Sequence, residues 1–177
     1  CRSGWVRVVY EDQVVSFVMH EGDCVLQPPG IRHRVLESSP GLEVIEIACP
    51  AEHETFRDHE LELPTQTVNP DRTFEGQRFV RHIAATAQGD DVRDAGIAQA
   101  TGGLASVRVL RPKRDLARKH DGDFLFFVIL KGRAHVTSGT HGAHTLETDD
   151  ACVIPKGDYT VAGAEQCELL EVSLPAL

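Results

Sequence analysis

The sequence lacks several features that would place a protein in a class at once. None of its apolar runs approaches the about 20 residues of a membrane-spanning helix. No run of lysine or arginine offsets a formal net charge of -9, so we expect neither a membrane nor a nucleic acid partner. Its five cysteines form no C-x-x-C pair and resemble reduced cysteines that serve as small hydrophobic residues. With no charged and apolar leader, this composition predicts a soluble, cytoplasmic protein.

Motifs of several enzyme classes are also missing. His53 and His59 each lie between acidic residues but do not make the H-E-x-x-H pattern of zinc proteases. Thr101-Gly102-Gly103 lacks the other glycines and the lysine of a phosphate loop. No G-x-S-x-G segment is present, so a serine hydrolase of the usual strand-to-helix kind has no support.

The sequence does contain many short strand patterns. Val, Ile, Leu and aromatic residues gather in short segments bounded by Gly, Pro, Asp or Ser. This spacing is typical of an all-β fold. The expected strands are residues 5–10, 14–19, 24–27, 33–37 and 42–48, then 104–110, 124–130, 133–137, 144–147, 151–154 and 167–174.

One segment of the chain recurs. The flanks of the repeat match as well, since Gly4 aligns with Gly132, and residues 42–47 align with residues 167–172. The chain is therefore two copies of one β unit. In the central segment, Gly22, Pro28, Gly30 and His33 correspond to Asp149, Pro155, Gly157 and Thr160, each 127 positions further on.

The repeat divides the chain into modules. The part between the copies is polar and carries Pro64 and Pro70, so we expect a connector with at most a helical turn near residues 51–59. The predicted organisation is a partial first module over residues 1–53, a connector over 54–95 and a second module over 96–177.

The segment from Gly22 to His33 resembles the second sequence motif of the cupin superfamily, with all four marker residues at the right spacing. His120 and the residues up to Gly132 look like the first cupin motif, which reads roughly H-x-H, then Glu or Gln, then a strand ending in Gly. The resemblance implies two cupin-type jelly-roll barrels, that is, a bicupin.

The resemblance also implies a divalent transition metal, commonly iron, manganese, nickel or zinc. Motif histidines and one oxygen ligand on rigid neighbouring strands hold such a metal and leave positions open for a substrate. His33 matches the last ligand of the family. Glu37 is a second candidate if it faces inward, although a surface role is an alternative.

The second module departs from the ligand pattern. The positions expected to join His120 are Arg118, Leu125 and Thr160, and one histidine cannot hold a metal where about three ligands are usual. Leu125 and Phe127 share one face of a strand. We therefore expect a metal-free pocket, lined by His120, Leu125, Phe127 and Thr160.

The first module has a different defect. Gly4 aligns with Gly132, so the counterpart of residues 104–131, which would carry the other expected ligands, does not occur in this sequence. We expect the first barrel to be incomplete as it stands, with unpaired strand edges near residues 5–10. Such edges pair readily with other chains, which predicts a homodimer.

Three functions remain open. The first is a small-molecule-binding cupin with a metal site at His33 in a complete first barrel, either an oxygenase or an isomerase. The second is a non-catalytic, metal-free binding or sensing protein, and the third is a structural or storage role. Fold alone does not decide among them.

Overall fold

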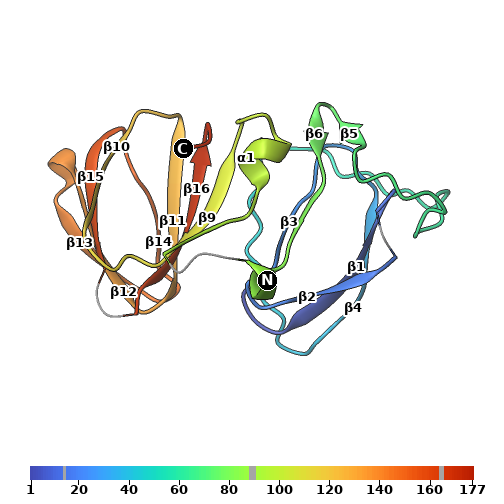
Figure 1. Ribbon diagram of the computed structural model, residues 1–177, viewed down its shortest axis with the longest axis horizontal. Helices are drawn as coiled ribbons and strands as arrows, with labels where there is room; N and C mark the ends of the chain where they lie inside the picture. Colours follow the sequence, from blue (N-terminus) through green and yellow to red (C-terminus); the bar gives the residue numbers. More distant parts are fainter. Residues whose placement is uncertain (14, 88–90, 164–165) are drawn as a thin grey trace. The chain divides into compact units, whose positions relative to one another are not determined.

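The computed structural model describes residues 1–13, 15–87, 91–163 and 166–177 (Figure 1). Val14 of the strand expected over 14–19, and residues 88–90 of the expected connector, lie outside the described residues. The chain forms two compact units, Cys1–Thr86 and Ala87–Leu177, which we call unit 1 and unit 2.

The regular secondary structure of both units is almost entirely β-strand, as predicted. Helical structure in the described residues is limited to α1 (Ile97–Ala100) and the 3-10 turns η1 (Ala84–Thr86) and η2 (Gly139–His141). None of these is long enough to cross a membrane.

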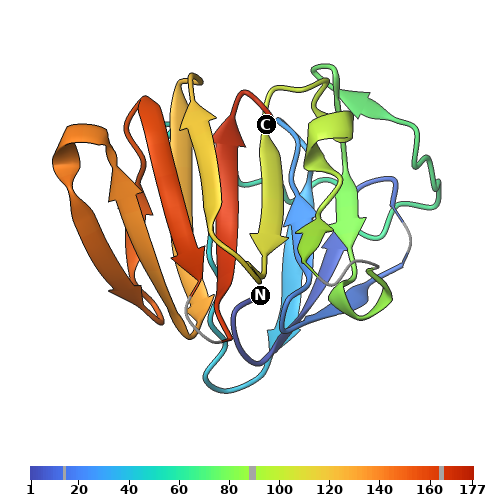
Figure 2. The ribbon, with the colours of Figure 1, turned by 60° about the vertical axis from the view of Figure 1, so that its left-hand side comes forward.

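Unit 2 contains two antiparallel sheets, whose strands run from yellow to red in Figures 1 and 2. Strand β12 shows why these residues form strands: its inward positions are buried and the alternate positions are exposed. The four-stranded sheet has the order β10 (Leu116–His120), β15 (Gly157–Gly163), β12 (Arg133–Ser138), β13 (Ala143–Glu147). The five-stranded sheet has the order β14 (Ala151–Val153), β11 (Phe124–Lys131), β16 (Glu168–Leu174), β9 (Ser106–Leu110), β8 (Val92–Asp94).

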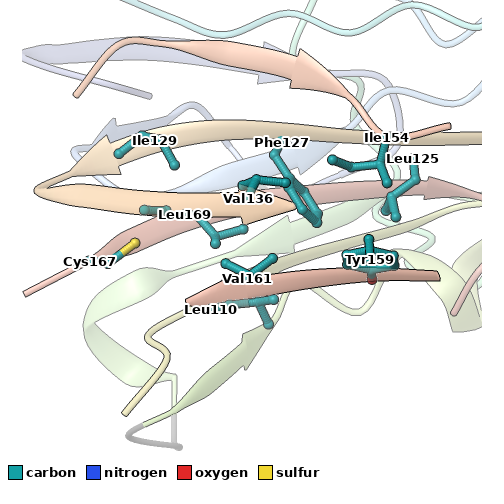
Figure 3. Packing of buried hydrophobic residues seen from close by; sticks show 11 residues of the cluster. Leu110, Leu125, Phe127, Ile129, Val136, Ile154, Tyr159, Val161, Cys167 and Leu169 are labelled. Atoms are coloured by element: carbon teal, nitrogen blue, oxygen red, sulfur yellow. The ribbon is translucent and has the colours of Figure 1, made fainter. Parts of the chain in front are cut away.

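The core of unit 2 lies between its two sheets. Leu125, Phe127 and Ile129 of β11 are all 0% exposed, and they pack with Val136 and Val161 from the four-stranded sheet. Figure 3 shows these side chains gathered between the strands. Burial of this continuous apolar layer stabilises the unit by about 25 cal/mol for each Å² of apolar surface removed from water.

Unit 1 repeats part of this arrangement. Its core contains Val8, Tyr10 and Phe17, with Met19 and Phe74 beside them. Its main sheet has the order β2 (Phe17–His20), β1 (Trp5–Tyr10), β4 (His33–Ser38), and two small sheets pair β3 (Cys24–Leu26) with β7 (Val80–His82) and β5 (Thr73–Phe74) with β6 (Gln77–Arg78).

The sheet orders support the internal repeat. The order β2-β1-β4 in unit 1 matches β13-β12-β15 in unit 2. Unit 2 adds β10 beyond β15, whereas the described residues add no strand beyond β4. The described strands do not close into a hydrogen-bonded barrel in either unit.

The strand expected over residues 42–48 does not form. Only Glu43 makes a bridge there, with Ser3. The corresponding strand β16 lies between β11 and β9, and among the described residues unit 1 has no counterpart to either. An apolar segment without neighbouring strands has no partner for its backbone groups and stays irregular.

Two further expectations about unit 1 are wrong. Strand β1 is central rather than an edge, since it pairs with both β2 and β4, and the edges of that sheet are β2 and β4. No helical turn occurs near residues 51–59. The predicted connector instead supplies β5, β6 and β7 to unit 1 and β8 to unit 2.

Candidate functional site

One layer of the unit 2 interior carries the buried groups Ser138, Tyr159 and Glu171. In the five-stranded sheet, Cys152, Phe127, Glu171 and Arg108 are successive cross-strand partners on β14, β11, β16 and β9. Because partner residues in a sheet project on the same side, these four side chains form one row.

The four-stranded sheet supplies the opposite row. Ser138, Tyr159 and Arg118 are cross-strand partners on β12, β15 and β10. Two contacts join the rows: the rings of Phe127 and Tyr159 meet edge to face at 5.9 Å, and Arg118 Nη1 lies 3.1 Å from Glu171. We call these seven residues the middle layer.

The β9 and β10 end of the middle layer is ionic. Glu171 is 1% exposed, and its Oε1 accepts hydrogen bonds from Nε of Arg108, at 2.8 Å, and from Nη2. Its Oε2 accepts the bond from Arg118. Charge-assisted hydrogen bonds of this kind replace the water contacts that a buried carboxylate gives up.

Two buried polar atoms beside this cluster have no hydrogen-bond partner among the described residues: the Tyr159 hydroxyl and Nδ1 of His120. Burial raises the pKa of the Tyr159 phenol; nearby Glu171 raises it further and Arg118 opposes the shift. The hydroxyl therefore keeps its proton at neutral pH and remains a donor. Buried polar groups without partners are rare in native proteins and indicate a water, an ion or a ligand that completes them.

The opposite end of the middle layer opens into a cavity of about 330 Å³. Ser138 and Cys152 belong to both the layer and the cavity wall. Burial raises the pKa of the Cys152 thiol, which keeps it in its neutral form. The remaining lining residues, mostly apolar, are Val136, His141, His144, Thr145, Leu146, Val153, Ile154 and Pro155.

A larger hollow of about 440 Å³ lies in unit 1 but has less chemical content. Its lining consists of one loop segment, residues 56–60, with no wall from another element. The cavity of unit 2 is bounded by four elements, so it is the better candidate for a binding site.

The structure places three of the four predicted pocket residues in the unit 2 interior. His120 is 2% exposed, and Leu125 and Phe127 are fully buried. Thr160 is different: it is exposed and pairs with Thr137 and Ala117 on the outer face. Its assignment to the pocket is wrong because strand residues alternate between faces, and Tyr159 takes the inward position.

The strand registers explain this error. Gly4 aligns with Gly132, so Tyr10 corresponds to Ser138. Tyr10 pairs with His33, and Ser138 pairs with Tyr159. The counterpart of His33 is therefore Tyr159 rather than Thr160.

The imidazole of His33, at an exposed position at the start of β4, makes one polar contact and one ring contact. Its Nδ1 lies 3.2 Å from the backbone oxygen of Ile31, and its ring stacks on Tyr10 at 5.5 Å. A carbonyl oxygen only accepts, so Nδ1 carries the proton and Nε2 keeps its lone pair. This is the usual way in which an outer contact sets the tautomer of a metal ligand.

Glu37 does not join His33. The register of β1 and β4 shifts between Arg7 and Val8, so Val8 pairs with Val35 but Arg7 pairs with Glu37. This bulge moves Glu37 to the face opposite His33, where it forms an ion pair with Arg7 at 3.3 Å. The expectation of a shared His33 and Glu37 site is therefore wrong.

The described residues do not provide a metal site. No three His, Cys, Asp or Glu side chains converge in the part of the chain that the structure describes. In unit 2 the inward positions that correspond to cupin ligands are Arg118, His120, Leu125 and Tyr159, of which only His120 is an ordinary metal ligand. The chain thus does not fit a metal in unit 2, and unit 1 supplies His33 alone.

Sequence reasoning missed Glu171, Arg108 and the lining of the cavity. A signal for the ionic pair is present, because Glu171 falls between Leu169 and Ser173 on the inward face of an apolar strand. A charged residue at a core position of an alternating pattern predicts a buried partner of opposite charge.

Comparisons with known proteins support the fold. No family model matches the sequence, and no curated protein matches it. The solved structure of protein Ylba from E. coli has a TM-score of 0.64 at 11% identity, and the alignment covers 98% of this chain and 64% of that protein. At this identity the likeness shows the fold alone.

Other similar structures cover about half of the chain. A cupin-2 domain protein from Shewanella frigidimarina has a TM-score of 0.41 at 15% identity, covering 51% of this chain and 86% of its own. KdgF from a Halomonas species has a TM-score of 0.45 at 13% identity, covering 54% and 94% respectively. The described part of the present structure is nearly all-β, with almost no helix.

Proposed function

We propose that this chain is a small-molecule-binding protein of the cupin type, and that unit 2 binds its ligand without a metal. The observation that carries the proposal is the cavity of about 330 Å³ beside the middle layer. This volume lies at the lower end of the range for ligand pockets, about 300 to 1,000 Å³.

The lining of the cavity indicates the kind of ligand. Val136, Leu146 and Ile154 offer apolar surface, whereas Ser138 offers a hydroxyl. His144 faces the backbone oxygen of His141 through Nε2, at 2.9 Å. A small, mostly apolar molecule with one hydrogen-bonding group fits these walls.

The test is to fill the cavity. Indole is a suitable probe, followed by NMR titration of unit 2 resonances and by calorimetry. Leu146→Trp places a large side chain in the cavity and should weaken indole binding at least tenfold. Val92→Trp, at an exposed position on β8, is the matched control and should leave binding unchanged. Saturable binding that Leu146→Trp does not affect would contradict the proposal, as would no binding of indole to the wild type.

A second candidate function is a metal-dependent oxygenase or isomerase that uses His33, favoured by the orientation of the His33 ring. It requires that the first module be completed by strands equivalent to residues 104–131, which would supply further ligands. Metal analysis tests it: a stoichiometric metal should be lost in His33→Ala and kept in His59→Ala, a control in an exposed loop. A wild-type protein that contains no metal would contradict this candidate function.

We also propose that another chain pairs with the free strand edge of unit 1. Val35 is 59% exposed, Val44 54% and Ile47 42%, and β4 is an edge strand. Exposed apolar side chains beside a free strand edge favour pairing with another chain, and we propose a homodimer. A monodisperse monomer in light scattering at micromolar concentration would contradict it. The five free cysteines are consistent with a cytoplasmic location.

A further inference from the structure

The ionic cluster of unit 2 carries more positive charge than it neutralises. The side chains of Arg108 and Arg118 contribute two positive charges and that of Glu171 one negative charge, a net side-chain charge of +1, and Arg108 Nη1 also donates a hydrogen bond to the main-chain oxygen of Leu177 at 3.3 Å. Arg118 uses one described hydrogen bond for Glu171, although a guanidinium carries five N–H donors. The cluster therefore has donors to spare.

The Tyr159 hydroxyl adds another donor to the same place. Tyr159 is 3% exposed and is the cross-strand partner of Arg118. Its proton has no acceptor in the described part of the chain; burial and then Glu171 raise the pKa of the phenol, while Arg118, close enough to interact with the hydroxyl oxygen, lowers it. A buried hydroxyl donor beside a cation needs a hydrogen-bond acceptor.

The cluster can be reached from solvent. The side chain of Arg118 is 31% exposed and that of Arg108 is 17% exposed, while Glu171 behind them is 1% exposed. Strand β10, which carries Arg118, is an edge strand of its sheet. The Arg118 side chain is therefore partly open to solvent.

We propose that this cluster binds a small carboxylate, which accepts hydrogen bonds from the Arg118 guanidinium and the Tyr159 hydroxyl. The site is separate from the cavity between β13 and β14 and does not depend on it. A monovalent anion matches the net charge of +1, and the planar carboxylate matches the fork of a guanidinium. Glu171, held in place by Arg108, repels a phosphate dianion more strongly than a monovalent ligand.

Acetate is the probe. Titration with sodium acetate against sodium chloride, at a constant ionic strength of about 0.15 M, separates specific binding from screening. The Nε–H resonance of Arg118 should shift saturably with acetate and not with chloride. An equal response to both salts, or no saturable shift, would overturn the proposal.

Variants test the two donors. Tyr159→Phe keeps the ring and its contact with Phe127 but removes the hydroxyl, and it should weaken acetate binding about tenfold, as loss of a hydrogen bond to a charged group does. Arg118→Lys keeps the positive charge but removes the planar pair of N–H donors of the guanidinium, and it should weaken acetate binding as well. Arg111→Met is the matched control, since Arg111 binds Glu168 rather than Glu171, and it should bind acetate as the wild type does.

A structural role for the hydroxyl predicts a different result. Acetate binding of equal affinity in Tyr159→Phe and in the wild type would overturn the assignment of the hydroxyl as a ligand-binding group. Indole titration of the same variants keeps the two sites apart: Tyr159→Phe should still bind indole in the cavity.

Discussion

Units 1 and 2 contain the same strand pattern in two different environments. Residues 42–47 correspond to residues 167–172, yet the first segment is irregular and exposed whereas the second lies in the central strand β16. Val44 is 54% exposed and its counterpart Leu169 is 0% exposed. The comparison teaches that apolar alternation alone does not make a strand, because its backbone groups and side chains also need neighbours.

The largest expected difference between the units concerns a pair of glutamates. Glu171→Gln leaves two arginines facing each other and should lower the free energy of unfolding of unit 2 by about 3 kcal/mol or more. Glu46, its exposed counterpart in unit 1, should tolerate the same change to within about 0.5 kcal/mol. Hydrogen exchange measures unit 2, and fluorescence of Trp5, the only tryptophan, measures unit 1. Equal effects would mean that Glu46 is buried in solution.

The next pair tests packing. Leu169→Ala removes a fully buried side chain and should cost unit 2 about 2 to 5 kcal/mol. Val44→Ala should change the stability of unit 1 by less than about 0.5 kcal/mol, as measured by denaturant unfolding. A large loss of unfolding free energy in Val44→Ala would contradict the expected difference between the units. It would indicate that another chain covers this segment.

Gly4 and its counterpart Gly132 provide a further test of the difference between the units. Gly132 and Gly4 have φ angles of 77° and 74°, a region that costs other residues about 1 to 2 kcal/mol. A Cβ at Gly132 would lie 2.7 Å from the backbone oxygen of Gln166, whereas at Gly4 it would meet the hydroxyl of Ser39, which can rotate away. Gly132→Ala should therefore destabilise its unit more than Gly4→Ala, by calorimetric melting temperature. The reverse order would contradict these backbone positions.

The smallest effect concerns acid stability and belongs to unit 1. A hydrogen bond from Thr67, followed by one from Arg72, lowers the pKa of Asp12 from 3.8. A carboxyl with a lowered folded-state pKa contributes stability above its unfolded pKa, and this stability is lost as pH falls through the folded pKa. Asp12→Asn should thus flatten the acid limb of Trp5-monitored unfolding. Asp71→Asn, at an exposed position nearby, is the control; the same flattening there would contradict the assignment to Asp12.

Local patterns predicted much of the fold but less of the site. Strands β1, β4, β11 and β12 lie where short apolar segments between turn residues placed them. Strand β10 was missed because three of its five residues, Arg118, Lys119 and His120, are polar, so its pattern resembles a loop. His120, Leu125 and Phe127, expected to line a pocket, are buried but do not line the cavity of unit 2. Thr160 was misplaced by one residue, since a small difference in register reverses the face of every side chain.

The sequence by itself determined the nearly all-β class and the turn that precedes His33, because these depend on spacing between neighbours in the chain. Only the tertiary structure decided that Tyr159 takes the inward position, that a bulge turns Glu37 away from His33, and that Glu171 meets Arg108 and Arg118. Each of these depends on which strands pair and in what register, and the partners are distant in the sequence.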